Sequence, residues 1–309
     1  MAKHALHQLV EFARTIRFSH TLFAMPFALG TALLAAPPYP DGWSLALLVA
    51  CMVAARTAAM GLNRVADAAI DARNPRTAGR AIPAGRLGRR AALAMALASG
   101  AAFVAMAWLF LPLRGNVWPG LLAAPFLAVL MGYSWTKRFT ILTHWALGLS
   151  LGLAPVGAWI ALRGEIALAP VLIGAAVMFW TAGFDILYAL QDAEVDRREG
   201  LRSVPARFGP AAARWLAIDC HAVMLPLLAA VPGAYSRTGR PYLLASVAVV
   251  AIIAAAMVIQ HMRARRATAA AIAANFLPMN AFVSIIWLGG VVVDIALSRQ
   301  IMGWLAGSS

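Results

Sequence analysis

Long apolar runs dominate this chain and limit the folds that are open to it. A membrane-spanning helix needs about 20 mostly apolar residues. Nine runs of this kind are predicted, at about 19–37, 43–62, 91–113, 117–136, 142–162, 167–189, 211–232, 241–261 and 276–297. Hydrophobic residues make up 62% of the chain and charged residues 12%, whereas about a quarter of a typical soluble domain is charged. The sequence therefore predicts an all-α polytopic membrane protein, with residues 1–309 forming a single domain.

The basic residues lie mainly in short segments between these runs. The net charge of +14 is compatible with nucleic-acid binding, but arginines confined to short loops are what membrane orientation requires, so we expect no nucleic-acid partner. Residues 1–17 carry Lys3, Glu11, Arg14 and Arg17. We predict an amphipathic helix on the membrane surface there, and no secretory signal.

The distribution of Lys and Arg between the two sides of the membrane predicts an orientation. Most of them fall in segments on the same side as the N-terminus. The segments on the other side contain only Arg114, Arg163, Arg237, Arg240 and Arg299. This asymmetry predicts a cytoplasmic N-terminus. Nine spans would then place the C-terminus on the outer side of a bacterial inner membrane. The lipid bilayer would surround the spans.

Two short acidic clusters follow the second and the sixth apolar runs. The chain has only 12 Asp and Glu residues, so the positions of these acids carry information. Asn63, Asp67 and Asp71 are spaced by four, as are Asp192 and Asp196. Residues four apart share one face of a helix. An Asp within a span costs about 2.5–3.5 kcal/mol on insertion scales, so each row is predicted to have compensating partners.

Several arginines follow both clusters, and together they suggest a ligand. Mg²⁺ takes oxygen ligands and bridges carboxylates to substrate phosphates, while guanidinium groups bind phosphate oxygens as a fork. The candidate phosphate-binding arginines are Arg73, Arg76, Arg80, Arg197 and Arg202. A diphosphate inside a membrane cavity implies that the rest of the ligand is apolar, as in an isoprenoid diphosphate. Mg²⁺ and arginine would neutralise the departing diphosphate, and a dry cavity would protect the allylic cation until an electron-rich acceptor attacks it.

The motifs resemble those of a known family. The chain has N-x₃-D-x₃-D, then R-T-x-x-R and P-x-G, and later Y-x₃-D-x₃-D, with a Tyr-x₃-Lys-Arg stretch closing the fourth run. This set is similar to the UbiA superfamily of intramembrane prenyltransferases, and the resemblance covers nearly the whole chain. It implies a nine-helix barrel, open to the cytoplasm, that binds a polyprenyl diphosphate through Mg²⁺.

The resemblance also implies roles for individual residues. The metal ligands would be Asn63, Asp67, Asp71, Asp192 and Asp196, and the four carboxylates together with Tyr188 would be catalytic. The diphosphate would be bound by Asn63, Arg73, Arg76, Arg80, Lys137 and Arg202. One position departs from the pattern, because many members carry Asp directly after the motif's Asn and this chain has Arg64. The first motif therefore has two carboxylates here.

Two longer strings narrow the expected reaction. NPRTAGRAIPAGR and DRREGLRSVPARFG are similar to the quinone-pathway branch labelled 4-hydroxybenzoate polyprenyltransferase, and to the sub-branch that acts on 1,4-dihydroxy-6-naphthoate on the futalosine route to menaquinone. The expected function is Mg²⁺-dependent transfer of a polyprenyl group to one of these aromatic acids in ubiquinone or menaquinone biosynthesis. The alternatives are another UbiA-type prenyltransferase, a terpene cyclase or hydrolase, or a transporter. The clustering of acids at one membrane face disfavours the transporter.

Other polar residues in the spans have structural and functional interpretations. Asp185 and Tyr188 lie seven and four residues before Asp192, on the same predicted face. Asp185 is interpreted as a hydrogen-bond acceptor to a neighbouring helix, with a catalytic base as the alternative. Tyr188 either packs or steadies the allylic cation. Arg56 either pairs with a carbonyl or binds the acceptor's carboxylate.

The remaining polar groups in the spans are expected to be structural. Asn280 and Asp294 are predicted to make helix–helix hydrogen bonds. The isolated histidines are not expected to bind a metal, and the two cysteines are expected to be packing residues: His20, His144, His221, Cys51 and Cys220.

Overall fold

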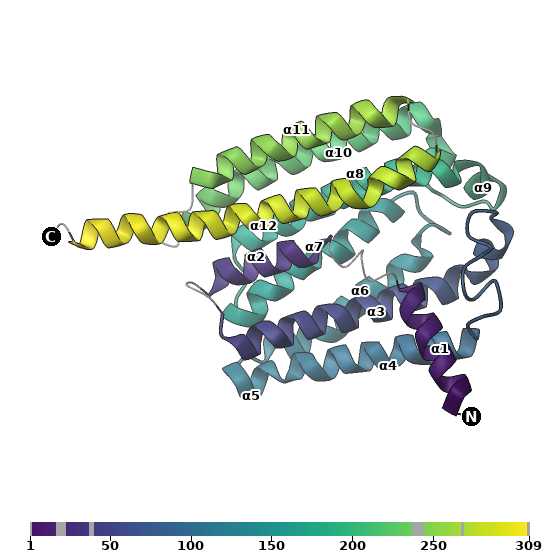
Figure 1. Cartoon of the computed structure of the whole chain (residues 1–309), viewed down its shortest axis with the longest axis horizontal. Coiled ribbons are helices and arrows are strands. Elements are labelled where there is room, and N and C mark those ends of the chain that lie inside the picture. The colour runs from purple at the N-terminus through teal and green to yellow at the C-terminus, as the bar shows by residue number, and fades with distance from the viewer. Residues whose placement is uncertain (1, 17–22, 37–39, 237–243, 267–268, 308–309) are drawn as a thin grey trace.

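The computed structural model describes residues 2–16, 23–36, 40–236, 244–266 and 269–307, and every regular element in these ranges is helical. Long helices run side by side along one axis (Figure 1). The elements are α1 (Ala2–Thr15), α2 (Met25–Ala35), α3 (Gly42–Arg73), α4 (Arg89–Trp108), α5 (Phe110–Arg114), α6 (Trp118–Thr136), α7 (Thr143–Arg163), α8 (Leu168–Ala189), the 3-10 helix η2 (Leu190–Asp192), α9 (Ala193–Arg198), α10 (Val204–Ser236), α11 (Leu244–Arg266) and α12 (Ala269–Gly307).

Eight helical stretches in the described residues are long and apolar enough to cross a membrane, and they coincide with the second to ninth predicted spans. The chain is thus an integral membrane protein. The first predicted span falls on α2, an apolar helix of 11 residues. At 1.5 Å per residue, α2 is about 16 Å long, whereas a span crosses about 30 Å. Residues 19–22 and 37 of that prediction lie outside the described residues. The prediction of nine spans is therefore confirmed for eight.

The second acidic row does not lie on one continuous α-helix, although Asp185, Asp192 and Asp196 all line one cavity. The helix α8 ends at Ala189, a 3-10 turn follows, and α9 begins at Ala193. Asp192 has φ −105° and ψ 0°, which lies outside the α-helical region. Short 3-10 turns are frequent at helix ends. The first row, in contrast, lies on the unbroken helix α3.

Glycines allow α7 and α8 to cross at backbone contact. A Cβ atom on Gly148 would lie 2.3 Å from the Met178 carbonyl oxygen, and one on Gly152 would lie 2.4 Å from the Gly174 carbonyl oxygen. Small residues at such crossings are typical of helix packing in membranes, where association depends on close contact. The crossing fixes the position of α7 relative to α8, and both helices contribute side chains to the cavity described below.

An aromatic core lies between α2, α8 and α12. The Phe27 ring centroid is 4.8 Å from that of Trp287 and 5.3 Å from that of Trp180, and all three side chains are buried. The helices α10 and α11 pack outside this core, α10 against α8 and α11 against α12. These outer helices contribute none of the cavity-lining residues found in the described chain. The helices of the predicted nine-helix barrel therefore contribute unequally to the cavity, which is lined mainly by α3 to α8.

The surface helix α1 anchors the loop between α3 and α4. Phe12 is buried in a small cluster with Ala81 and Leu87 of that loop. The Gln8 side chain also donates to the Arg86 carbonyl oxygen at 3.3 Å and accepts from the Gly88 amide at 2.8 Å. The prediction of a helix within residues 1–17 is confirmed over 2–15. Its docking holds a loop whose arginines reach the cavity.

Candidate active site

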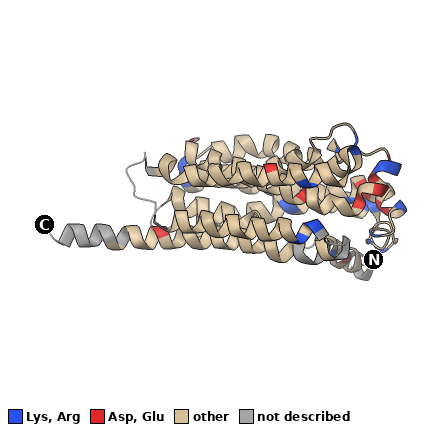
Figure 2. Cartoon of the chain, turned by 90° about the horizontal axis from the view of Figure 1, so that it is seen from above, with Lys and Arg blue, Asp and Glu red and all other residues tan. Residues whose placement is uncertain are grey.

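A cavity of about 470 Å³ runs along one face of α3. Along this helix the lining changes from Leu48 and Met52 to Asn63, Asp67 and Asp71. The cavity thus has an apolar body and a polar mouth. The mouth lies at the end of the molecule where α1 and most of the described Lys, Arg, Asp and Glu residues gather (Figure 2).

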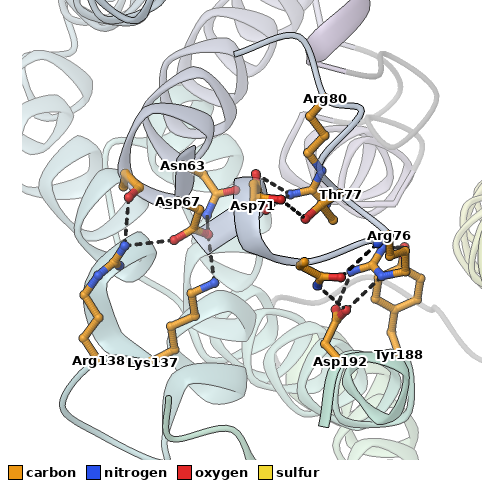
Figure 3. Close-up of polar contacts among 12 residues, drawn as sticks. Asn63, Asp67, Asp71, Arg76, Thr77, Arg80, Lys137, Arg138, Tyr188 and Asp192 are labelled. Carbon is orange, nitrogen blue, oxygen red and sulfur yellow. Dashed lines mark hydrogen bonds and ion pairs between the residues drawn. The ribbon is translucent and has the colours of Figure 1, made fainter. Parts of the chain in front are cut away.

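Asp67 is buried at the mouth, between two basic side chains of the turn after α6 (Figure 3). Lys137 Nζ donates to Asp67 Oδ2 at 2.9 Å, and Arg138 Nη2 donates to Asp67 Oδ1 at 3.0 Å. Asn63 Nδ2 also donates to Asp67 Oδ2, at 3.2 Å, from one turn earlier on α3. The predicted sharing of one helix face by Asn63 and Asp67 is confirmed. Two positive charges compensate the buried carboxylate.

Asp71 is bound by the loop that follows its own helix. Arg80 Nη1 donates to both carboxylate oxygens of Asp71, at 2.7 and 2.8 Å. The Thr77 hydroxyl donates to the Asp71 carbonyl oxygen at 3.1 Å, near the C-terminus of α3. The R-T-x-x-R motif thus folds back onto the acid that precedes it.

Asp192 joins the second acidic row to the same loop (Figure 3). Arg76 binds Asp192 in a bidentate contact, in which Nε donates to Oδ1 at 2.9 Å and Nη2 donates to Oδ2. Asn74 Nδ2 donates to Asp192 Oδ1 at 2.9 Å. Arg76 also lies over the Tyr188 ring, 5.6 Å from its centroid. These contacts bring together two segments more than 110 residues apart in the sequence.

The acidic rows line one cavity, with Asp196 as a further lining residue. In the described part of the chain, no three His, Cys, Asp or Glu side chains converge closely enough to hold an ion. Basic side chains contact three of the four carboxylates instead. The carboxylate and amide oxygens present are nonetheless the donors that Mg²⁺ prefers. The guanidinium group of Arg76 contacts its carboxylate through two nitrogens, which is the fork geometry that suits phosphate oxygens.

Three of the candidate phosphate-binding arginines are not among the cavity-lining residues: Arg73, Arg197 and Arg202. Arg197 pairs with Glu194, three residues earlier in the chain. Arg73 pairs with Glu199 and lowers the pKa of that carboxyl group. Arg202 Nη1 donates to the Phe139 carbonyl oxygen at 2.8 Å, and its amide donates to the Lys137 carbonyl oxygen at 2.7 Å. Arg73 and Arg202 brace the rim of the mouth by holding its turns together. The predicted residues that do line the cavity are Asn63, Asp67, Asp71, Arg76, Arg80, Lys137, Tyr188, Asp192 and Asp196.

Some site residues carried no signal in the sequence analysis. Asn74 ends α3 and binds Asp192, and its place between Asp71 and Arg76 is the only local indication of this role. Arg64 lines the cavity, and its Nε is buried with no hydrogen-bond partner among the residues that the structure describes. His144 was judged isolated, yet its Nδ1 lies 2.6 Å from Asp185 Oδ2. The expected hydrogen bond from a neighbouring helix to Asp185 is thereby confirmed.

Outside the cavity, the predictions of structural roles for polar residues are confirmed only in part. Asp294 on α12 accepts from the Ala245 amide of α11 at 2.7 Å, which confirms the predicted helix–helix bond. Asn280 does not follow that prediction, because its Nδ2 donates to the Phe276 carbonyl oxygen of its own helix. His221 pairs with His261 at 2.8 Å. The two cysteines are buried, as expected of packing residues. His20 lies outside the described residues.

Comparison with known proteins relates this geometry to a family. Residues 23–297 match the UbiA prenyltransferase family. The chain is 31% identical over 222 residues to a 4-hydroxybenzoate octaprenyltransferase from Methylobacillus flagellatus, covering 72% of each chain. It is also 35% identical over 196 residues to a protoheme IX farnesyltransferase from Azorhizobium caulinodans, covering 63% of this chain and 62% of that one.

Solved structures agree with this assignment. A UbiA homologue from Aeropyrum pernix K1, in its apo form, superposes with a TM-score of 0.78 at 32% identity, covering 90% of this chain and 99% of the other. A UbiA homologue from Archaeoglobus fulgidus, bound to GPP and Mg²⁺, has a TM-score of 0.68 at 19% identity, covering 92% and 99%. The second likeness concerns the fold alone. From its sequence match and its architecture, the chain belongs to the UbiA prenyltransferase family.

Proposed function

We propose that this prenyltransferase moves a polyprenyl group from a polyprenyl diphosphate to an aromatic acid, either 4-hydroxybenzoate or 1,4-dihydroxy-6-naphthoate, with Mg²⁺ as cofactor. The observation that supports this most is the division of one cavity into an apolar body and an acidic, arginine-rich mouth. An isoprenoid diphosphate has the same two halves. The whole chain, 1–309, would act as one domain in quinone biosynthesis.

The residues of the mouth would hold the diphosphate end of the donor. Asn63, Asp67, Asp71, Asp192 and Asp196 would ligate Mg²⁺, which supplies neutralisation of the charge that develops on the leaving diphosphate. On binding the cofactor, Asp67, Asp71 and Asp192 would release Lys137, Arg80 and Arg76. These basic side chains would then turn to phosphate oxygens within the same mouth. For these three carboxylates, the exchange keeps the charges paired before and after binding.

The body of the cavity would hold the prenyl chain. Its lining includes Phe103, Phe126, Leu122 and Leu151, which exclude water from the reacting carbon. An allylic cation formed there is protected from hydrolysis until the acceptor attacks. Tyr188, whose ring packs against Phe276 with centroids 4.4 Å apart, would border the reacting carbon at the boundary between body and mouth.

The acceptor is the least constrained part of the proposal, because the relatives include enzymes named for 4-hydroxybenzoate and for protoheme IX. Arg56 and Arg64 both line the cavity on α3, and both have Tyr133 as an electrostatic neighbour. Two guanidinium groups inside an apolar cavity favour an acceptor that carries a carboxylate. A small aromatic acid also fits alongside a prenyl chain in about 470 Å³ more readily than a porphyrin does.

We also propose the orientation that the Lys and Arg distribution predicts, in a bacterial plasma membrane. The mouth would face the cytoplasm together with α1, and the C-terminus would lie on the outer side. The placement of α1 and the end of α12 at opposite ends of the molecule supports this topology (Figure 1). Labelling of single cysteines introduced at residues 79 and 115 in intact cells would test it, because only the second should react with an impermeant reagent.

The reaction itself is tested with an acceptor panel. Purified protein with Mg²⁺ and geranyl diphosphate is offered 4-hydroxybenzoate, 1,4-dihydroxy-6-naphthoate and protoheme IX, and products are read by mass spectrometry. We expect one of the two acids to be prenylated, and we expect EDTA to abolish the product. Prenylation of protoheme alone would overturn the assigned acceptor. Product formation that is unchanged in EDTA would overturn the assigned cofactor.

A further inference from the structure

The cavity contains one carboxylate that the diphosphate site does not use. Asp185 lies on α8, seven residues before Asp192, and it lines the cavity. None of the basic side chains of the mouth contacts it in the described structure. Its side chain is 25% exposed, whereas that of its partner His144 is 2% exposed. A buried histidine thus supports a carboxylate that faces the cavity.

The hydrogen bonds of His144 determine its tautomer. The Val204 amide donates to His144 Nε2 at 3.2 Å, so Nε2 carries a lone pair. The proton of the neutral ring is therefore on Nδ1, which donates to Asp185 Oδ2 at 2.6 Å. Within the described residues Asp185 Oδ1 has no protein hydrogen-bond partner. One carboxylate oxygen thus accepts from the histidine, and the second has no such bond among the described residues, on a side chain that lines the cavity.

Asp185 shares an electrostatic neighbour, Tyr133, with the first acidic row, and all of these residues line the cavity. Tyr133 on α6 has Arg56, Arg64, Asp67 and Asp185 as its charged neighbours. One phenol ring therefore lies close both to a carboxylate of the first acidic row and to Asp185. The α7–α8 glycine crossing keeps His144 and Asp185 in register, because both helices are fixed there at backbone contact.

We propose that Asp185 is the proton acceptor of the transfer step and that His144 is its positioning residue; this rests on the proposed function. As the C–O bond of the prenyl diphosphate breaks, its electron pair leaves with the diphosphate. A ring carbon of the acceptor supplies the electron pair of the new C–C bond, which leaves the ring positively charged. The C–H proton at that carbon then passes to Asp185 Oδ1, and the electrons of the C–H bond restore the aromatic ring. Water at the mouth finally takes the proton from Asp185.

The arrangement has the features that general base catalysis requires. A base contributes about 10²–10⁴-fold when it is held within hydrogen-bond reach of the proton. The histidine donor fixes the orientation of the Asp185 carboxylate, as a carboxylate does for a catalytic histidine in the reverse arrangement. A purely structural pair would need no cavity-facing oxygen.

The test uses 4-hydroxybenzoate and 1,4-dihydroxy-6-naphthoate, each with and without deuterium at the ring carbons next to its hydroxyl groups. Geranyl diphosphate with Mg²⁺ is the donor, and its binding by calorimetry verifies that each variant is folded. In the wild type we expect equal rates for the two isotopologues, because breaking of the C–O bond is slow. In Asp185→Asn we expect kcat to fall about 100-fold with little change in KM for the donor, and the deuterated acceptor to react more slowly than the light one.

Two further variants test His144. His144→Asn keeps a donor near Asp185 and should retain part of the wild-type kcat. The kcat of His144→Phe should fall towards that of Asp185→Asn, and this variant should show the isotope effect. His221→Phe and Asp294→Asn are the matched controls, because both residues are buried and neither lines the cavity.

The outcomes separate the inference from the proposed function. A wild-type enzyme that prenylates neither acid overturns the proposed function, and the inference with it. An active wild type with a fully active Asp185→Asn variant overturns the inference alone. A slow Asp185→Asn variant with no isotope effect also overturns it, because that result describes a structural residue.

Discussion

The aspartates at the two ends of the molecule are held in different ways. At the mouth of the cavity, Asp67 and Asp192 are held by the side chains of lysine, arginine and asparagine. At the opposite end, Asp41 accepts from the Ser44 amide at 2.9 Å at the start of α3. Asp294 there accepts from the Ala245 amide and from the Ser246 hydroxyl, both at 2.7 Å.

The difference shows which carboxylates are free to change partners. A backbone amide cannot leave its acceptor without disturbing the helix that it begins. An arginine side chain can rotate from a carboxylate to a phosphate and stay paired. The same residue type therefore serves helix capping at one end of the bundle and exchangeable binding at the other. The four predictions below test this contrast, in order of decreasing effect.

The largest effect is expected at the mouth. Asp192→Asn removes the charge that faces Arg76 and one proposed ligand of the metal. We expect prenyl transfer to fall about 10²–10³-fold, the range seen when one group that stabilises developing charge is removed. The protein should stay folded, because Arg76 can reach water. Product formation in reconstituted membranes measures the loss, and Asp294→Asn is the control. Activity within twofold of the wild type would show that Asp192 is not part of the active site.

The second effect is on stability at the opposite end. Asp294→Ala leaves the Ala245 amide and the Ser246 hydroxyl without their acceptor, and the Asp294 side chain is buried. An unsatisfied buried donor costs about 1–3 kcal/mol. We expect a lower unfolding temperature in detergent, with the kcat of the folded fraction unchanged. A loss of kcat with an unchanged unfolding temperature would reverse the roles assigned to the two ends.

A third prediction concerns the fork that Arg76 forms. Arg76→Lys keeps the positive charge but cannot bind a carboxylate or a phosphate through two parallel hydrogen bonds. We expect KM for geranyl diphosphate to rise about tenfold, which corresponds to about 1.4 kcal/mol. Steady-state kinetics measure the change, and Arg73→Lys is the matched control, because Arg73 does not line the cavity. Equal effects of the two substitutions would mean that the fork has no special role.

The smallest effect is a dependence on pH at the capping end. The Ser44 amide, and to a smaller extent Arg114, lower the pKa of Asp41 below its ordinary value. A lowered pKa in the folded state adds stability above the unfolded pKa of about 3.9, and this stability is lost as the pH falls through the folded value. The unfolding temperatures of wild type and Asp41→Asn should therefore differ at pH 7 and converge below about pH 4. A difference that is constant with pH would contradict this assignment.

Much of the site was predictable where the relevant spacing is local. Asn63, Asp67 and Asp71 lie on one face because they are four residues apart on a helix that continues unbroken. The second row was only partly predictable. The 3-10 turn at Leu190–Asp192 ends α8 without a Gly or Pro to indicate it, and the partners that hold Asp192 come from the loop after α3.

The partners of the cavity residues could not be read from the sequence. His144 meets Asp185 across 41 residues, because glycines at the α7–α8 crossing let the two backbones touch. Arg73 and Arg202 follow the acidic clusters as Arg76 and Arg80 do, yet they contact the turns at the rim and do not line the cavity. Spacing along a helix gives the direction of a side chain, but an arginine is long enough to reach several partners, and only the packed loops select one.

By itself, the sequence determined that this chain enters a membrane as a set of helices with two acidic rows near one end. The physical reason is that apolar length and local charge are properties of short segments. The tertiary structure decided that α10 and α11 stay outside the cavity, which cations pair with which carboxylates, and that Asp185 has one oxygen held and one free. Those outcomes depend on contacts between residues far apart in the chain, which form only when the helices pack.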